Sequence, residues 1–241
     1  MNLIVCGDSW SRGAELKNHE KTFGELLAQD LACEHFFNCS LDASSIPHLV
    51  LQLKQGLEHL KHHNLDPRNT IVLFFLTGTD RDLCWSDTMP IGTGFLKSDP
   101  PPYNQRRVIL LNPSDKLHQE WYEKYQSPEL SDFRVNTTLL ALQQICEKHG
   151  LIDRYIWGWH HFPHWPEIDL SRIYDQGHTS AAAMFYDQHP GPVGTVDVSK
   201  LVLNRNPYIW PNGGHPNQLG HQLIAQHLSN WIKKDLNTGC M

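Results

Sequence analysis

Two short segments near opposite ends of the chain carry residue types that could perform nucleophilic chemistry. Gly7-Asp8-Ser9 follows a short apolar run, so a serine hydroxyl would sit on a tight turn at the end of a strand. His215-Pro216 stands just before a helix-like segment. A serine becomes a nucleophile when a neighbouring base takes its proton, and histidine is a common base in that role. Ser9 and His215 are therefore the first candidates for a catalytic site.

A structural role fits the first segment equally well. Gly7 suits a tight turn, and Asp8 or Ser9 would cap the start of a helix. A further histidine, His221, is better explained by helix packing than as a second base. The surrounding sequence is needed to distinguish a catalytic site from a capped turn.

The composition predicts a globular chain. Of its 241 residues, 19% are charged and 40% hydrophobic, which fits neither a disordered nor a membrane protein. The longest apolar run, Ile71 to Leu76, is far below the roughly 20 residues that span a bilayer, and it predicts a buried strand. We expect a single domain over residues 1–241 and no membrane partner.

The charge balance argues against a nucleic-acid partner. The chain has 20 Lys and Arg against 26 Asp and Glu, a net charge of −6, whereas nucleic-acid binding needs a basic surface. Its 16 histidines would become charged in mild acid, so activity and solubility should depend on pH. Activity should fall as the base His215 becomes protonated.

Cysteine spacing and the N-terminal residues predict a cytoplasmic location. The six cysteines show no CxxC pair, which favours reduced thiols over a disulfide framework or a zinc site. The chain begins directly with a strand-like apolar run, and no secretory signal is visible before it.

Strand-like and helix-like segments alternate along the chain. Short apolar runs predict strands, and apolar residues at i, i+3 and i+4 predict helices. The expected strands are 3–6, 35–38, 70–76 and 154–159, and the expected helices are 22–32, 47–62, 131–149 and 217–236. This alternation predicts an α/β fold in which helices cover both faces of a parallel sheet.

Two long stretches do not fit the alternation. Residues 84–128 contain the run Pro100-Pro101-Pro102 and an aromatic cluster, and residues 160–211 are rich in His, Pro and aromatics. Connections this long usually form lids or binding loops, so we expect them to face the substrate.

Polar segments also follow the other expected strands. In open parallel sheets, ligands bind beyond the carboxyl ends of the strands. Residues 38–45 follow the second expected strand, Thr77-Gly78-Thr79-Asp80 follows the third, and Asn212-Gly213-Gly214-His215-Pro216 precedes the last helix.

Together these segments resemble the motifs of the SGNH (GDSL-type) hydrolase family. Gly7-Asp8-Ser9 matches its first block, His215-Pro216 matches the end of its last, and 38–45 and 77–80 are looser matches. The order of the blocks is preserved along the whole chain. The resemblance implies a three-layer α/β/α fold of the flavodoxin-like type and a serine esterase that needs no cofactor.

The same resemblance assigns roles to individual residues. Ser9 would be the nucleophile and His215 the base, with Asn212 at the position of the usual acid. The backbone N–H groups of Ser9 and Ala43 and the side chain of Thr79 would form the oxyanion hole.

Three departures from the family pattern weaken this assignment. Ala43 replaces a glycine but keeps its N–H, whereas Thr79 replaces an asparagine, and a missing oxyanion donor costs about 10²–10³ in rate. Asn212 replaces the aspartate that orients the histidine, a change that costs a serine protease about 10⁴. Either a backbone carbonyl or another carboxylate orients His215, or the enzyme is slow. The alternative is a catalytically degenerate module that binds carbohydrate or serves a structural role.

Candidate substrate contacts are Asp8, Trp10, Asp80 and Trp159. The aromatic residues favour a small acyl ester or an acylated carbohydrate, although core packing is the other fate of such side chains. The histidines between Trp157 and Trp165 match no standard zinc spacing, so we expect no metal. A nucleotide-binding flavodoxin-like protein is a third possibility, but the chain lacks a Gly-rich phosphate loop.

Overall fold

The protein is described by a computed structural model. The structure describes residues 1–42, 44–78, 127–159, 163–186, 198–203, 205–211 and 213–238, together with the backbone of 82–86 and 107–111.

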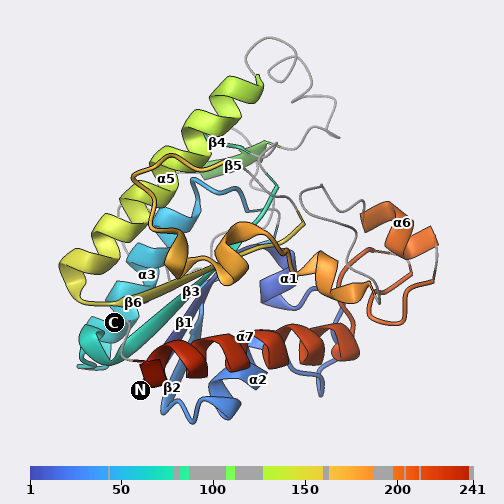
Figure 1. Ribbon diagram of the computed structural model, residues 1–241, viewed down its shortest axis with the longest axis horizontal. Helices are drawn as coiled ribbons and strands as arrows, with labels where there is room; N and C mark the ends of the chain where they lie inside the picture. Colours follow the sequence, from blue (N-terminus) through green and yellow to red (C-terminus); the bar gives the residue numbers. More distant parts are fainter. Residues whose placement is uncertain are drawn as a thin grey trace.

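A four-stranded parallel sheet forms the centre of the fold (Figure 1). Its strands lie in the order β2 (His35–Asn38), β1 (Asn2–Cys6), β3 (Thr70–Leu76) and β6 (Ile152–Trp157). Every residue of β3 is buried, as expected for a central strand covered on both faces. Because all four strands are parallel, their carboxyl ends lie at one edge of the sheet.

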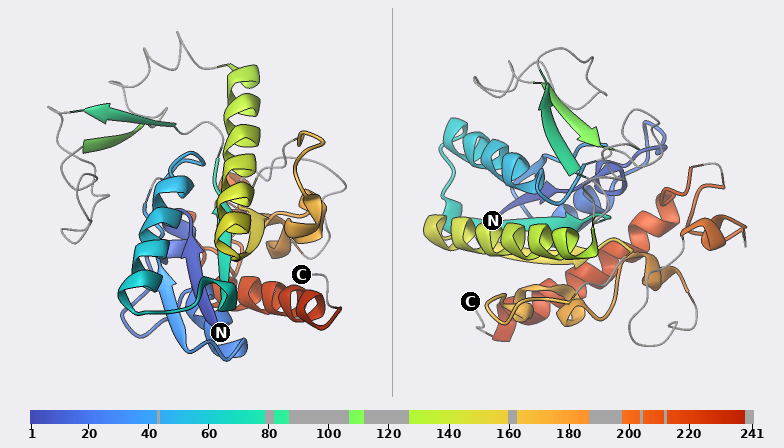
Figure 2. Two further views of the ribbon diagram at one scale, coloured as in Figure 1. Left: turned by 90° about the vertical axis from the view of Figure 1, so that its left-hand side faces the viewer. Right: turned by 90° about the horizontal axis from the view of Figure 1, so that it is seen from above.

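Helices cover both faces of this sheet (Figure 2). The side chains of β1 alternate between two cores: Leu3 packs with the helices of one face and Ile4 with those of the other. One face carries α2 (Phe23–Asp30) and α7 (Gln218–Thr238), and the other carries α3 (Leu49–His62) and α5 (Pro128–His149). The result is the three-layer α/β/α arrangement that the sequence predicts.

The boundaries differ from the expected ones where local hydrogen bonds extend or end an element. The helix expected from residue 131 begins at Pro128, because the Ser127 side chain caps it by accepting from the Leu130 N–H. The last strand begins at Ile152 and ends at Trp157, before Gly158. Four cysteines are described as free thiols: Cys6, Cys33, Cys39 and Cys146.

The two long connections contain short elements of their own. An antiparallel pair, β4 (Asp82–Ser86) and β5 (Arg107–Leu111), lies within the first. The second contains 3₁₀ turns and the short helix α6: η2 (Leu170–Arg172), η3 (Tyr174–Gly177), η4 (Ala182–Phe185) and α6 (Val198–Leu203). Another 3₁₀ turn, η1 (Pro67–Asn69), precedes β3. Across the described ranges, we find no helix with the length and apolar content that a membrane span requires.

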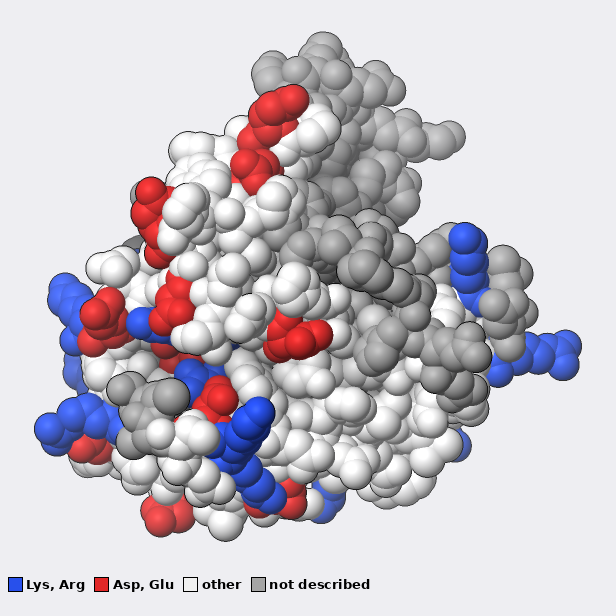
Figure 3. Space-filling model, viewed as in Figure 1, with Lys and Arg blue, Asp and Glu red and all other residues white. Residues whose placement is uncertain are grey.

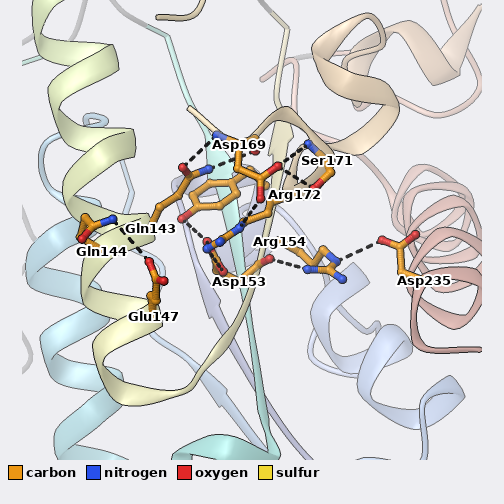
Figure 4. Close-up of polar contacts among 10 residues, drawn as sticks. Gln143, Gln144, Glu147, Asp153, Arg154, Asp169, Ser171, Arg172 and Asp235 are labelled. Carbon is orange, nitrogen blue, oxygen red and sulfur yellow. Dashed lines mark hydrogen bonds and ion pairs between the residues drawn. The ribbon is translucent and has the colours of Figure 1, made fainter. Parts of the chain in front are cut away.

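Ion pairs occupy the outer edge of β6 (Figure 4). Asp153 is 3% exposed and lies 3.1 Å from Arg172, while Arg154 lies 3.3 Å from Asp235 of α7. Burial raises the pKa of Asp153 even with Arg172 beside it. Acidic and basic side chains also lie side by side on this face of the surface (Figure 3). A later segment of the chain covers this edge, because isolated parallel bridges join Tyr155 to Ile173 and Trp157 to Ser180.

Candidate active site

A tight turn after β1 presents Ser9 at the carboxyl edge of the sheet. The chain passes through Gly7 and Asp8 into the one-turn helix α1 (Ser9–Arg12). A Cβ atom at Gly7 would lie 2.1 Å from Ser11 Oγ and 2.8 Å from Phe75 Cβ. A larger residue would push the turn away from the sheet, so glycine at this position is a packing requirement.

Asp8 fastens the turn to two elements. Its Oδ1 accepts from the Trp10 N–H at 2.9 Å and its Oδ2 accepts from the Thr77 hydroxyl, at the end of β3, at 2.8 Å. Asp8 is 0% exposed. The expectation that it contacts substrate is therefore corrected: its carboxylate is enclosed by protein groups and positions the turn that carries Ser9.

Trp10 is also buried, inside an aromatic cluster. Its ring centroid lies 5.3 Å from that of Trp159, 5.8 Å from Phe185 and 6.0 Å from Phe75. The substrate-contact role expected for Trp10 is replaced by core packing beneath the site, whereas Trp159, just beyond β6, remains partly exposed.

The candidate base lies beside the candidate nucleophile at the carboxyl edge of the sheet. His215 Nε2 lies 3.0 Å from Ser9 Oγ. Hydrogen bonds fix the segment that carries His215 on both sides. The His215 carbonyl accepts from the Trp210 N–H at 2.8 Å, and the Asn217 side chain caps α7 by accepting from the Gly220 N–H at 3.1 Å. The structure thus brings together the two residues that the sequence placed at opposite ends of the chain.

A carboxylate that the sequence did not single out lies on the other side of the imidazole. Glu15 Oε2 lies 3.0 Å from His215 Nδ1. An ionised carboxylate can only accept a hydrogen bond, so Nδ1 carries the proton and the Nε2 lone pair faces the Ser9 hydroxyl. This tautomer is the one that general-base catalysis needs.

Two unusual backbone conformations bring Glu15 back to the site. The helix α1 ends at Gly13, which has a left-handed φ of +85°, and Glu15 itself has a φ of +70°. A left-handed conformation is uncommon for a residue other than glycine, and such strain gathers at functional sites. The carboxylate lies against Gly213, where a Cβ atom would come within 2.1 Å of Oε1. Only a residue without a side chain leaves room for it.

Four predicted site residues, Asn212, Ala43, Thr79 and Asp80, lie outside the described residues. Neighbours of Ala43 are tied to the nucleophile turn. Leu41 N–H donates to the Gly7 carbonyl at 3.1 Å. Arg12 of α1 pairs with Asp42 at 2.7 Å. Residues 41 and 42, which precede the expected oxyanion donor in the chain, thus contact the turn that carries Ser9.

His221 is a packing residue, as the sequence predicts. It is buried in α7, stacks on Phe23 and accepts from the Phe23 N–H at 3.0 Å through Nδ1. Burial lowers the pKa of His221 to about 4, so its ring is neutral at neutral pH. Among the residues that the structure describes, no three His, Cys, Asp or Glu side chains are grouped as a metal site requires.

Comparisons with known proteins identify the fold. No protein-family model matches the sequence, and no curated protein does. A lipolytic protein of the G-D-S-L family from Desulfitobacterium hafniense DCB-2, described as putative, superposes with a TM-score of 0.50 at 10% identity, over 95% of this chain and 98% of the other. The esterase EstA from Pseudoalteromonas sp. gives 0.47 at 14% identity, over 98% of both chains. A G-D-S-L family member from Veillonella parvula gives 0.42 at 13%, over 95% and 97%.

The chain has the fold of the GDSL-type, or SGNH, hydrolases. The first of these similarities covers nearly the whole of both chains, and the parallel sheet with helices on both faces agrees with it. The resemblance inferred from the motifs is thereby confirmed for the fold. At 10% identity the chemistry must be argued from the residues of this chain.

Proposed function

We propose that the protein is a serine ester hydrolase whose catalytic residues are Ser9, His215 and Glu15. One observation carries this proposal: His215 lies between the other two, with Nε2 3.0 Å from Ser9 Oγ and Nδ1 3.0 Å from Glu15 Oε2. A nucleophile, a base and a group that orients the base are the parts that acyl transfer requires.

In the first half-reaction, Ser9 Oγ attacks the ester carbonyl carbon and its proton passes to His215 Nε2. Glu15 stabilises the imidazolium, and the carbonyl oxygen becomes an oxyanion. The oxyanion collapses, the ester C–O bond breaks, and the Nε2 proton passes to the leaving oxygen, which departs as an alcohol. In the second half-reaction, water attacks the acyl carbon and gives a proton to His215 Nε2. The bond between that carbon and Ser9 Oγ then breaks, and Oγ takes the proton from Nε2. The carboxylic acid is released.

The oxyanion would be held by backbone N–H groups of Ser9 and Ala43 and by the Thr79 hydroxyl, as the family resemblance implies. The position of Ser9 at the start of α1 supports the first donor. The contacts of Leu41 with Gly7 and of Asp42 with Arg12 support the second, because they join the residues just before Ala43 in the chain to the turn that carries Ser9. Fixed donors of this kind lower the energy of the transition state without reorganisation.

We propose a small acyl ester or an acylated carbohydrate as the substrate. Trp159 supports this choice, since it extends the aromatic cluster below Ser9 toward the surface and is partly exposed. An aromatic face can stack on a sugar ring or cover a short acyl group. Asp80 stays a proposed contact on sequence grounds alone.

Hydrolysis of a short-chain chromogenic ester tests the proposal. The wild type should turn over the ester, and Ser9→Ala and His215→Gln should each lose about 10³-fold or more in kcat. Equal rates for the wild type and Ser9→Ala would contradict it. The degenerate binding module, which rested on Asn212 and Thr79, predicts no turnover in any of the three proteins; the Glu15 contact favours the enzyme.

A further inference from the structure

A buried glutamine of α3 hydrogen-bonds to the backbone of the turn that carries Ser9. Gln52 is 1% exposed. Its Oε1 accepts from the Gly7 N–H at 2.6 Å, and its Nε2 donates to the Gly7 carbonyl at 2.9 Å. One side chain therefore binds both backbone groups of Gly7, as a neighbouring strand would.

The same amide reaches the loop that follows β2. The second Nε2 hydrogen of Gln52 points to Ser44 Oγ at 2.8 Å, and Ser44 Oγ lies 3.1 Å from His48 Nδ1. Burial lowers the pKa of His48 to about 4, so the ring is neutral and Nδ1 can accept the Ser44 proton. The hydrogen bonds then run in one direction, from Gln52 to Ser44 to His48, and both N–H groups of Gln52 are used.

This network connects the two parts of the proposed catalytic machinery. Gly7 stands just before Asp8 and Ser9 in the chain, and Ser44 directly follows Ala43, the expected oxyanion donor. Catalytic groups must be held to within about 0.5 Å of their productive geometry. Gln52 hydrogen-bonds directly to both segments, at Gly7 and at Ser44.

We propose that Gln52 is a positioning residue that sets the separation between the turn that carries Ser9 and Ser44, the residue next to the proposed oxyanion donor in the chain, with Ser44 and His48 holding its amide in the required orientation. This inference rests on the proposed esterase function. Gln52 acts through Gly7 and Ser44, so its loss should reduce the rate of the chemical step while substrate binding persists.

The chain offers a matched control for this proposal. Gln143 of α5 is 5% exposed and grips another backbone residue in the same way: it accepts from the Asp169 N–H at 3.1 Å and donates to the Asp169 carbonyl at 3.2 Å (Figure 4). Asp169 belongs to the segment beside the outer edge of β6 and has no part in the proposed chemistry. A buried glutamine that serves stability alone should behave like Gln143.

The experiment compares Gln52→Met with Gln143→Met by ester kinetics and urea unfolding. We expect Gln52→Met to lower kcat about 10- to 100-fold with KM within about twofold, and Gln143→Met to keep the wild-type kcat despite a similar loss of stability. Ser44→Ala, which removes the middle of the network, should lower kcat in the same direction by about 10-fold, and it replaces Gln52→Met if that variant does not fold.

The outcomes separate this inference from the function on which it rests. Suppose that the wild type hydrolyses the ester and that kcat is unchanged in Gln52→Met, or in Ser44→Ala if that variant is used instead. This result would overturn the positioning role alone. A wild type without turnover would overturn the proposed esterase and this inference with it. A fall in kcat that is equal in Gln52→Met and Gln143→Met would show a general stability effect and would also overturn the positioning role.

Discussion

The carboxylate of Glu15 lies 3.0 Å from Nδ1 of His215, although the two residues are 200 positions apart in the chain. Glu15 follows closely after Ser9, so the proposed nucleophile and acid come from one short segment that turns back on itself at Gly13. His215 enters between them from the C-terminal part of the chain. The proposed acid thus comes from the N-terminal part of the chain, whereas Asn212 stands close to His215 in the sequence.

Replacing Glu15 should weaken the base without unfolding the protein. Glu15→Gln keeps the size of the side chain but removes the charge that stabilises the imidazolium and sets its tautomer, so we expect kcat to fall about 10²- to 10⁴-fold. Steady-state ester kinetics measure the effect. Glu34→Gln is the control, since Glu34 is exposed and its one described ion pair, to the chain's N-terminal amine, spans 3.9 Å. Equal activity in the two variants would exclude Glu15 from the triad.

Gly213→Ala should weaken the same contact between Glu15 and His215, because it adds a methyl group beside the Glu15 carboxylate. The new methyl group would lie 2.1 Å from Glu15 Oε1 and would displace the carboxylate, which can swing away at small cost because it ends a flexible side chain. We expect kcat to fall nearly as far as in Glu15→Gln, with the unfolding midpoint in urea little changed. In the double variant the two losses should not add, because both remove one interaction. Full additivity in kcat would contradict the account.

Much of the fold follows from local patterns in the sequence. The apolar run of β3 predicted its strand, and the apolar stripe of α3 predicted its helix. The sequence also singled out Ser9 and His215 from their residue types and flanking glycines, and the structure places the two side chains 3.0 Å apart.

Glu15 could not be found in this way. It belongs to no motif, and its contact with His215 depends on two left-handed residues that the sequence does not specify. Gln52 could have been noticed in the sequence, because it falls among Leu49, Leu53 and Leu60 on the apolar face of α3. A polar side chain in such a stripe must find partners inside the protein, and that reasoning could have singled it out.

Stability should fall in mild acid because two buried histidines resist protonation. Burial lowers the pKa of His48 and of His221 from 6.5 to about 4. The unfolded chain therefore takes up protons between these values and the folded protein does not. The stabilisation is complete above about pH 6.5 and is lost as the pH falls toward 4, by about 3 kcal/mol for each histidine.

Urea unfolding at a series of pH values from 7 to 4 measures this effect. In His221→Asn, which keeps an acceptor for the Phe23 N–H but cannot titrate, the dependence of the unfolding free energy on pH should weaken by about one proton. His19→Asn is the control, because His19 is exposed. An unchanged pH dependence in His221→Asn would show that this ring is protonated in the folded protein.

The ion pair at the outer edge of β6 should be needed for stability. Arg172→Met removes the cation 3.1 Å from Asp153, which is buried, and leaves a carboxylate without that partner. We expect a loss of about 3 kcal/mol in the free energy of unfolding. Arg68→Met is the matched change at an exposed pair, where Arg68 lies 2.9 Å from Asp66, and it should cost less than about 1 kcal/mol. Similar losses in both variants would refute the distinction.

Covalent labelling of Ser9 is the sharpest test of the proposed catalytic residues. A fluorophosphonate reacts with an activated serine and forms a phosphorus–oxygen bond as fluoride leaves, and mass spectrometry of the digested protein then locates the adduct. We expect one adduct, on Ser9, that forms rapidly in the wild type, far more slowly in Glu15→Gln and not at all in His215→Gln. A folded wild-type protein that carries no adduct on Ser9, or one that labels equally well without His215, would contradict the proposal.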